Sequence, residues 1–335
     1  MGLGDVLASV VVVSGAMLVI ASLTIIGVNR LVETARDVRR RLRAAAPGLG
    51  LLVAVLLVNK IARDYGPEVS WLIGWNVTGA ILGIEGVFVA VVQSFATPTL
   101  TAYFSFVYVY GYVFLLVFPL VAYLALERAE ALQRTAVAYC LNYAIGLVCY
   151  TLFISYGPRN VMPELVDPLL YSTYPSSQLL TSQVNTNTNV FPSLHTSLSV
   201  TVALLAWETR DRYPRWVPVA AVLAASVVVS TMYLGIHWGT DVVAGIGLAV
   251  VSVRLSGPVL DRLMALVERR AVTGGARDAA GRARARDPEW RTARSDGNVE
   301  TDGDRIDGID GDDGDLIDED DEDDGGANTP PVRSR

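Results

Sequence analysis

Apolar residues gather along this chain in eight long runs separated by polar segments. A run of about 20 apolar residues can cross a bilayer as an α-helix. The pattern therefore predicts an all-α fold, a polytopic membrane helical bundle of about seven spans. The first run lacks the basic start of a signal peptide and is longer than one, so we expect it to be a retained span. The runs cover residues 7–28, 47–59, 71–95, 102–126, 135–155, 192–207, 216–235 and 238–256.

Arginines predict the orientation of these spans, because basic residues accumulate on the cytoplasmic side of a membrane. They cluster after the first, fourth and sixth runs and again beyond the last one. The loop 30–43 and the C-terminal tail are then cytoplasmic, whereas the loop 156–191 and the turn at 236–237 face outside. The clusters comprise Arg30, Arg36, Arg39, Arg40, Arg41, Arg43, Arg128, Arg134, Arg210, Arg212, Arg215 and the arginines from Arg262 onward.

The region 47–100 leaves two arrangements open. In the first, residues 45–61 cross the membrane and 71–95 form helices at the outer interface, as the interruption near Glu85 and the tryptophans at 71 and 75 suggest. In the second, 71–95 cross and 47–59 are re-entrant. Both arrangements give seven spans with the N-terminus outside. We divide the chain into an N-terminal span with a basic cytoplasmic loop, a membrane-embedded catalytic core and a cytoplasmic tail, at residues 1–44, 45–257 and 258–335.

The formal net charge of −7 hides two opposite parts. Residues 300–324 hold fifteen acids and one arginine, a local charge of −14 that leaves +7 for the rest of the chain. Low hydrophobicity with dense like charge predicts disorder for residues 272–335. An Asp-rich tail in a chain whose only lysine is Lys60 resembles the composition of proteins from salt-loving archaea. We expect the protein to be embedded in the cell membrane, with no nucleic-acid partner.

The chain has only two histidines, and the predicted topology places both at the outer ends of spans. His195 begins the run 192–207, and His237 begins the last run with Asp241 four residues later on the same helix face. A carboxylate there fixes the imidazole tautomer, which leaves the second ring nitrogen of His237 as a nucleophile. His195 can then act as general acid and base.

Other polar groups at the same level suit a phosphate ligand. Arg159 follows the run 135–155 on the outer side and offers a planar guanidinium to phosphate oxygens. Ser193 and the backbone N–H groups that open the run 192–207 add donors at the positive end of a helix. The tyrosines of residues 103–112 are expected to pack at the membrane interface, and Cys140 and Cys149 as small apolar residues. We expect no metal and no other cofactor.

These motifs resemble the type 2 phosphatidic acid phosphatase superfamily, which includes the vanadium haloperoxidases. Its motif Pro-Ser-Gly-His is similar to residues 192–195, and its motif Ser-Arg-x5-His-x3-Asp is similar to residues 230–241. Its motif Lys-x6-Arg-Pro is matched weakly by Arg159-Asn160. The resemblance implies a six-helix core from residue 45 onward, a phosphohistidine on His237 and a lipid phosphate substrate. A reaction through a phosphohistidine requires no metal.

Three departures from the superfamily pattern bear on the substrate. Leu194 replaces glycine, Thr231 replaces arginine, and no lysine precedes Arg159 at the expected distance. Lys60 and Arg63 are candidates to supply the missing phosphate contacts. Phe-Pro-Ser-Leu-His with Tyr-Leu-x-x-His resembles the inositol phosphorylceramide synthase branch, which implies transfer of a phospho-headgroup instead of hydrolysis. A non-catalytic membrane protein, or a transporter whose histidines move protons, is the third hypothesis.

Overall fold

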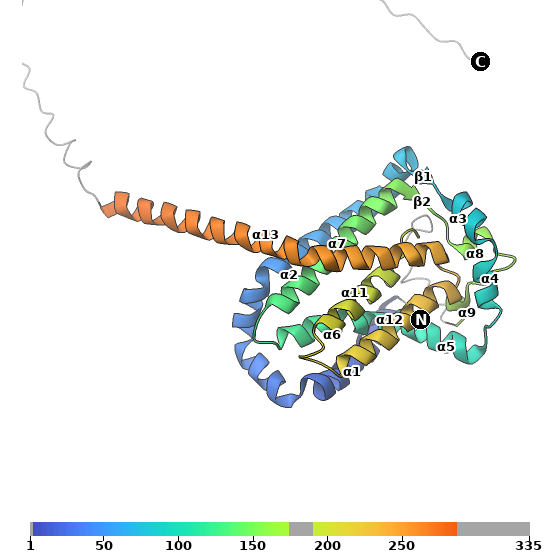
Figure 1. The fold of residues 1–335 in the computed structure, drawn as a ribbon, viewed down its shortest axis with the longest axis horizontal. Coiled ribbons are helices and arrows are strands. Elements are labelled where there is room, and N and C mark those ends of the chain that lie inside the picture. Colours follow the sequence, from blue (N-terminus) through green and yellow to red (C-terminus); the bar gives the residue numbers. More distant parts are fainter. Residues whose placement is uncertain (1–2, 174–189, 287–335) are drawn as a thin grey trace, which may run out of the picture. The chain divides into compact units, whose positions relative to one another are not determined.

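A computed structural model describes residues 3–173 and 190–286 of the chain. The described residues up to 275 form one compact unit, and residues 276–286 belong to a second unit. The described part is almost entirely helical (Figure 1), which confirms the predicted fold class. Its elements are α1 (Leu3–Ala21), the π-helix η1 (Ser22–Ile26), α2 (Val28–Ile73), β1 (Trp75–Asn76), α3 (Thr78–Glu85), α4 (Phe88–Gln93), α5 (Pro98–Phe106), the π-helix η2 (Val107–Gly111), α6 (Tyr112–Leu124), α7 (Glu130–Leu152), β2 (Phe153–Ile154), α8 (Pro158–Val161), α9 (Leu169–Thr173), α11 (Leu194–Glu208), α12 (Trp216–Tyr233) and α13 (Gly239–Arg286).

Six helical segments among the described residues are long and apolar enough to cross a membrane. Their outward faces carry apolar side chains such as Val11 and Val12 of α1, which are 71% and 69% exposed and suit contact with lipid. The seventh expected span is α11, whose 15 residues make it about 22 Å long and shorter than a bilayer core. The six segments are Gly4–Ile26, Val28–Ala62, Pro98–Leu124, Glu130–Leu152, Trp216–Tyr233 and Gly239–Arg270.

Helix α11 lies inside the bundle and not at its surface. Its residues Leu198, Ser199 and Thr201 are fully buried against the neighbouring helices. Within this core, Asn142 of α7 donates to the hydroxyl of Thr201 at 3.1 Å and accepts from the hydroxyl of Ser197. Protein, and not lipid, surrounds α11. This helix therefore does not need to be as long or as apolar as a helix that faces lipid. This packing fixes the first turn of α11, which carries His195.

The length of helix α2 contradicts one prediction from the sequence and supports another. Residues 30–43 are not a loop, because α2 runs unbroken for 46 residues. The guanidinium of Arg41 donates to the carbonyls of Leu124 and Leu126, which fastens this helix to the end of α6. Residues 71–95 break into short pieces, so the candidate span in this region is the one that includes 45–61. A parallel pair of short strands, β1 and β2, joins the end of α2 to the end of α7.

The C-terminal expectation also needs a correction. Residues 272–286 are helical and continue α13, whereas disorder was predicted to begin at 272. The acidic stretch 300–324 and the rest of 287–335 lie outside the described residues.

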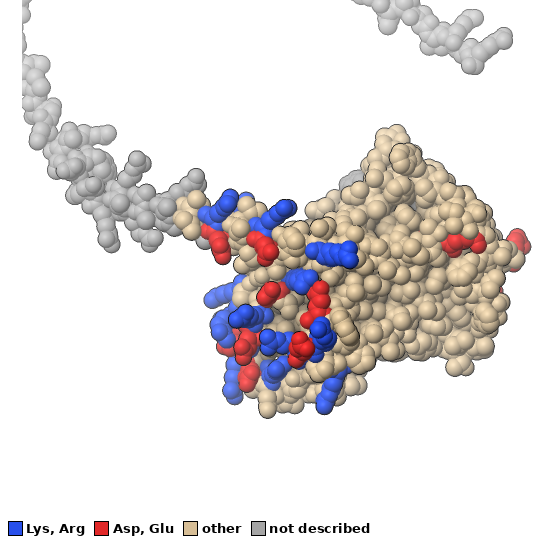
Figure 2. Space-filling model, viewed as in Figure 1, with Lys and Arg blue, Asp and Glu red and all other residues tan. Residues whose placement is uncertain are grey.

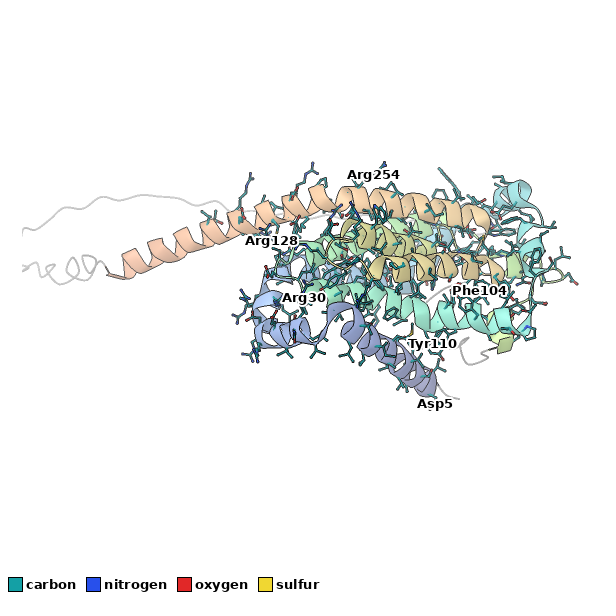
Figure 3. The ribbon with its side chains drawn as sticks, turned by 60° about the horizontal axis from the view of Figure 1, so that its bottom comes forward. Asp5, Arg30, Phe104, Tyr110, Arg128 and Arg254 are labelled. Atoms are coloured by element: carbon teal, nitrogen blue, oxygen red, sulfur yellow. The ribbon has the colours of Figure 1, made fainter. Side chains whose placement is uncertain are left out.

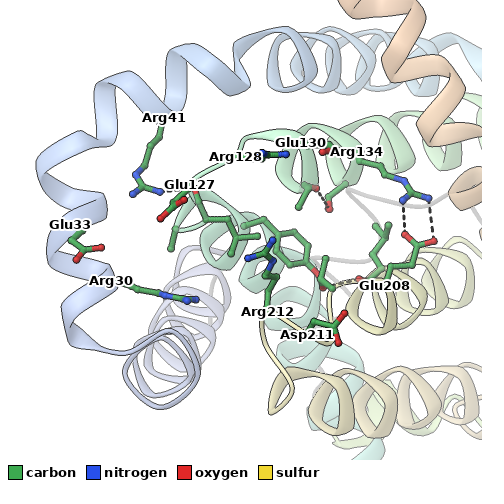
Figure 4. Close-up of a pocket in the computed structure, with 17 residues that line it drawn as sticks. Arg30, Glu33, Arg41, Glu127, Arg128, Glu130, Arg134, Glu208, Asp211 and Arg212 are labelled. Atoms are coloured by element: carbon green, nitrogen blue, oxygen red, sulfur yellow. Dashed lines mark hydrogen bonds and ion pairs between the residues drawn. The ribbon is translucent and has the colours of Figure 1, made fainter.

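Charged side chains are concentrated at one end of the bundle (Figure 2). Three arginine clusters that the sequence predicts on one side meet there, around a cavity of about 400 Å³ (Figure 4). Arg134 and Glu208 form an ion pair at 2.8 Å across its wall. Asp5 and Phe104 lie toward the other end of the bundle than Arg30 and Arg128 (Figure 3). The cavity is lined by Arg30, Arg41, Arg128, Arg134 and Arg212 and by Glu33, Glu127, Glu130, Glu208 and Asp211, so its charges balance.

Candidate active site

His237 lies in the tight turn between α12 and α13. Gly235 opens this turn with a φ of 69°, a conformation that favours glycine. The backbone N–H groups of Ile236 and His237 both donate to the carbonyl of Thr231 at 3.0 Å. The His237 side chain is only 2% exposed. Backbone bonds and burial therefore hold the imidazole in one place.

Asp241 contacts His237 as the sequence predicts. Its Oδ2 lies 3.3 Å from Nδ1 of His237 and accepts the backbone N–H of Trp238 at 2.9 Å. The carboxylate is fully buried on the first turn of α13. With Nδ1 protonated toward Asp241, Nε2 of His237 carries the free lone pair.

His195 approaches the same point from α11. The two imidazole ring centroids are 6.5 Å apart, too far for a direct hydrogen bond. The backbone N–H of Ser193 donates to the carbonyl of Asp241 at 3.1 Å, which ties the first turn of α11 to the first turn of α13. The structure thus brings together the three residues that the sequence selected for chemistry.

Ser193 caps the helix that carries His195. Its hydroxyl oxygen accepts the N–H of Thr196 at 3.3 Å, and the side chain is fully buried. This contact does not use the hydroxyl hydrogen, so the donation to phosphate that the sequence predicts stays a prediction.

Arg159 is placed beside the His237 turn by close backbone packing. Its backbone N–H donates to the carbonyl of Gly235 at 3.2 Å. One guanidinium nitrogen, Nη2, donates to the hydroxyl of Tyr171 at 2.9 Å, and the guanidinium lies 4.6 Å from the centre of that ring. The other, Nη1, is buried and has no hydrogen-bond partner among the described residues. A buried donor of this kind is suited to an anionic ligand.

Glu85 also contributes to this region, although its sequence context indicated only an interruption of the apolar run 71–95. Its carboxylate accepts the backbone N–H of Gly239 at 2.8 Å and also that of Thr240. These are the first N–H groups of α13, so Glu85 caps the helix that carries Asp241. A lone carboxylate in an otherwise apolar segment, 71–95, was the available signal.

Tyr108 and Tyr112 also lie in the site, although we expected the tyrosines of 103–112 at the membrane interface. The Tyr108 ring stacks on the His195 ring with centroids 4.5 Å apart and planes 19° apart. The Tyr112 centroid is 4.3 Å from that of His195. Nothing in the local sequence separates these two tyrosines from Tyr103 and Tyr110 on the same helix.

Of the remaining predicted phosphate ligands, only Lys60 has a described side chain, and it is not joined to the site. Lys60 has an exposed side chain on α2, with no hydrogen bond or ion pair among the described contacts. The side chain of Arg63 lies outside the described residues. Thr231, which stands where the superfamily has arginine, is fully buried and donates to the carbonyl of Val228 at 2.7 Å. In the described part of the chain, no three His, Cys, Asp or Glu side chains form a metal-binding group.

Comparison with known proteins identifies the family. No curated protein and no solved structure matches the chain. The sequence profile of the PAP2 superfamily matches residues 80–255, a range that contains both histidines, Asp241, Arg159 and Glu85. The branch within the superfamily is not determined by this match. A helical membrane bundle with this match over more than half of its length belongs to the PAP2 superfamily, whose members generally catalyse phosphoryl transfer or hydrolysis.

Proposed function

We propose that this protein is an integral membrane lipid-phosphate phosphatase that acts through a phosphohistidine on His237. The observation that carries this proposal is the contact of His237 Nδ1 with Asp241 Oδ2 at 3.3 Å, with the ring centroid of His195 6.5 Å from that of His237. In our proposal the phosphoryl group reacts between these two rings, with His237 as the nucleophile and His195 as the acid.

In the first step, Nε2 of His237 attacks the phosphorus of the lipid phosphate. The N–P bond forms as the P–O bond to the leaving group breaks, and His195 gives its proton to the departing oxygen. Asp241 stabilises the positive charge that develops on the imidazole of His237. Arg159, through its buried Nη1, neutralises charge on the phosphate oxygens.

In the second step, His195 removes a proton from water, and the resulting hydroxide oxygen attacks the phosphorus. The new O–P bond forms, the N–P bond breaks, and inorganic phosphate leaves with His237 restored. His195 regains the proton that it needs for the next cycle. In each turnover His195 gives up and regains one proton, and His237 accepts and releases one phosphoryl group.

The position of the site along the bundle supports a substrate at the outer headgroup level. His195 begins α11, whereas Glu208 at the other end of α11 lines the arginine-rich cavity. Arginine-rich ends of membrane bundles face the cytoplasm. The site therefore faces outside in our proposal, and the C-terminal tail is cytoplasmic.

A headgroup transferase is the second candidate, favoured by Leu194 in the motif that resembles the inositol phosphorylceramide synthase branch. It would share the first step and use a lipid or polyol hydroxyl in place of water. The reactions differ only in the acceptor, so product analysis separates them.

The test uses the purified full-length protein in high salt with a panel of lipid phosphates, with and without polyol acceptors. Release of inorganic phosphate that is abolished in His237→Ala and strongly reduced in His195→Ala and Asp241→Asn supports the phosphatase. A headgroup-transferred product without free phosphate supports the transferase. Phosphoryl chemistry that is unchanged in all three variants would contradict both and favour a non-catalytic protein or transporter.

A further inference from the structure

The aromatic contacts of His195 suggest a function for Tyr108 and Tyr112 beyond packing. The Tyr108 ring lies nearly parallel to the imidazole, with 19° between the planes. The Tyr112 ring contacts the same imidazole at a tilt of 37° and a centroid distance of 4.3 Å. Two phenol rings therefore contact the imidazole of His195, whose ring centroid lies 6.5 Å from that of His237.

The helix that supplies these tyrosines changes its winding where they occur. Between α5 and α6, residues Val107–Gly111 form the π-helical turn η2, which contains Tyr108 and immediately precedes Tyr112. Single π-helical turns inside α-helices are uncommon and occur frequently at functional sites. Both tyrosine rings that contact the His195 imidazole therefore lie in or directly after this π-helical turn.

We propose that Tyr108 and Tyr112 are positioning residues that orient the imidazole of His195 and favour its protonated form. The proposal rests on the function given above, in which His195 must carry a proton to the leaving group. An aromatic ring presents a negative face, which attracts a cation above it. Two such faces favour imidazolium over neutral imidazole.

Other charged and titratable groups lie in the same region of the structure. The N-terminal end of α11 carries a partial positive charge at His195. Arg159 interacts electrostatically with the Tyr108 hydroxyl, and the ring centroid of His237 lies 6.5 Å from that of His195. Of the carboxylates in this region, Asp241 contacts His237 through Oδ2, and Glu85 accepts the first N–H groups of α13. From α7, the titratable side chains that interact with Tyr112 are Tyr139, Tyr143 and Tyr150.

The small number of histidines allows a direct test. Full-length protein labelled with ¹³C at the imidazole Cε1 gives two histidine signals, which His237→Gln assigns. We expect ring currents from two tyrosines to move the His195 signal upfield of free histidine in the unmodified protein. Tyr108→Leu and Tyr112→Leu should each remove part of that displacement and move the titration midpoint of His195 to lower pH. Tyr108→Phe and Tyr112→Phe keep the rings and should restore both properties.

Tyr110→Leu is the matched control, because Tyr110 lies in the same π-helical turn but contacts Phe106 and Ser9. It should leave the His195 signal and its titration unchanged. An unmodified protein whose His195 signal is not displaced, or leucine variants that leave signal and titration unchanged, would overturn the proposal.

Activity gives the second measurement. Each leucine variant should lower kcat for a lipid phosphate about tenfold near neutral pH, with recovery at lower pH where His195 is protonated again. The proposed function can fail independently of this positioning role. If the His195 signal shows the ring-current displacement but the protein has no phosphoryl-transfer or hydrolysis activity, the proposed phosphatase function is contradicted. The contact of the two tyrosines with His195 is then still supported. An active enzyme without the signature contradicts the tyrosine proposal alone.

Discussion

Gly157 packs directly on the carbonyl oxygen of Ile236. A β-carbon at Gly157 would lie 2.4 Å from that oxygen, much closer than real contacts allow. The backbone of Gly157 has an ordinary φ of −70°, so the close approach and not the dihedral angle requires glycine. Through this contact the segment that carries Arg159 lies against the turn that carries His237.

Gly157→Ala should therefore separate Arg159 from the His237 turn. We expect kcat/KM for a lipid phosphate to fall by about 10²-fold, because small displacements at a site of this kind are costly. The free energy of unfolding should fall by about 1–3 kcal/mol from overpacking. Steady-state kinetics and thermal unfolding in detergent measure the two effects. Gly79→Ala is the control, since a β-carbon there meets nothing within 4 Å; equal losses in both variants would contradict the close-packing argument.

Glu85→Gln should affect the reaction without removing any group that touches the substrate. The amide offers one acceptor oxygen and no charge, so one of the two N–H groups of Gly239 and Thr240 loses its partner. We expect a loss of about 1 kcal/mol in stability and a roughly tenfold lower kcat with little change in KM. Glu127→Gln, an exposed glutamate at the other end of the bundle, should change neither value. A KM effect larger than the kcat effect would argue that Glu85 contacts the substrate instead.

Arg159→Lys should weaken substrate binding while preserving the positive charge. Lysine lacks the planar fork that bonds Tyr171 through one nitrogen and leaves Nη1 for the phosphate. We expect KM for a lipid phosphate to rise about tenfold, in line with the loss of one charge-assisted hydrogen bond. Tyr171→Phe keeps the ring under the guanidinium and should have a smaller effect. If both substitutions leave KM unchanged, Arg159 does not bind the phosphate.

The long apolar runs and the spacing of His237 and Asp241 were sufficient to predict a membrane bundle and the contact between these two side chains. The spacing of four residues predicted this contact on one helix face, whereas His237 lies in the turn before α13 and meets Asp241 from there. The positive-inside rule brought His195 to the same end. The length of α2 could not be predicted, because residues 30–43 are polar enough for a loop. Their helical conformation depends on tertiary contacts such as those of Arg41 with the end of α6.

The residues that position the candidate reacting groups could not be predicted from the sequence either. Tyr108 and Tyr112 reach His195, and Glu85 reaches the first turn of α13, only because distant parts of the chain fold together. None of these residues is close in sequence to the residue that it supports. A motif identifies the groups that react, whereas the residues that position those groups follow from packing that a single sequence does not reveal.

The last prediction concerns Leu194, the residue that departs from the superfamily pattern. A β-carbon at Gly146 of α7 would lie 2.7 Å from Cδ2 of Leu194, so the leucine fills space that glycine leaves on the facing helix. Gly146→Ala should cost about 1–3 kcal/mol of stability by overpacking, and Leu194→Ala about 2–5 kcal/mol by leaving a cavity. The double variant should be more stable than the sum of the two losses predicts, because the new methyl group occupies the space that the leucine vacates.

The same pair of variants tests whether Leu194 selects the acceptor. Since its side chain points into α7, we expect Leu194→Ala to leave the ratio of hydrolysis to transfer unchanged while total activity falls with stability. Product analysis with and without a polyol acceptor measures that ratio, and the Gly146→Ala variant controls for changes in packing alone. A shift toward hydrolysis in Leu194→Ala but not in Gly146→Ala would show that the leucine acts on the acceptor and would strengthen the transferase candidate.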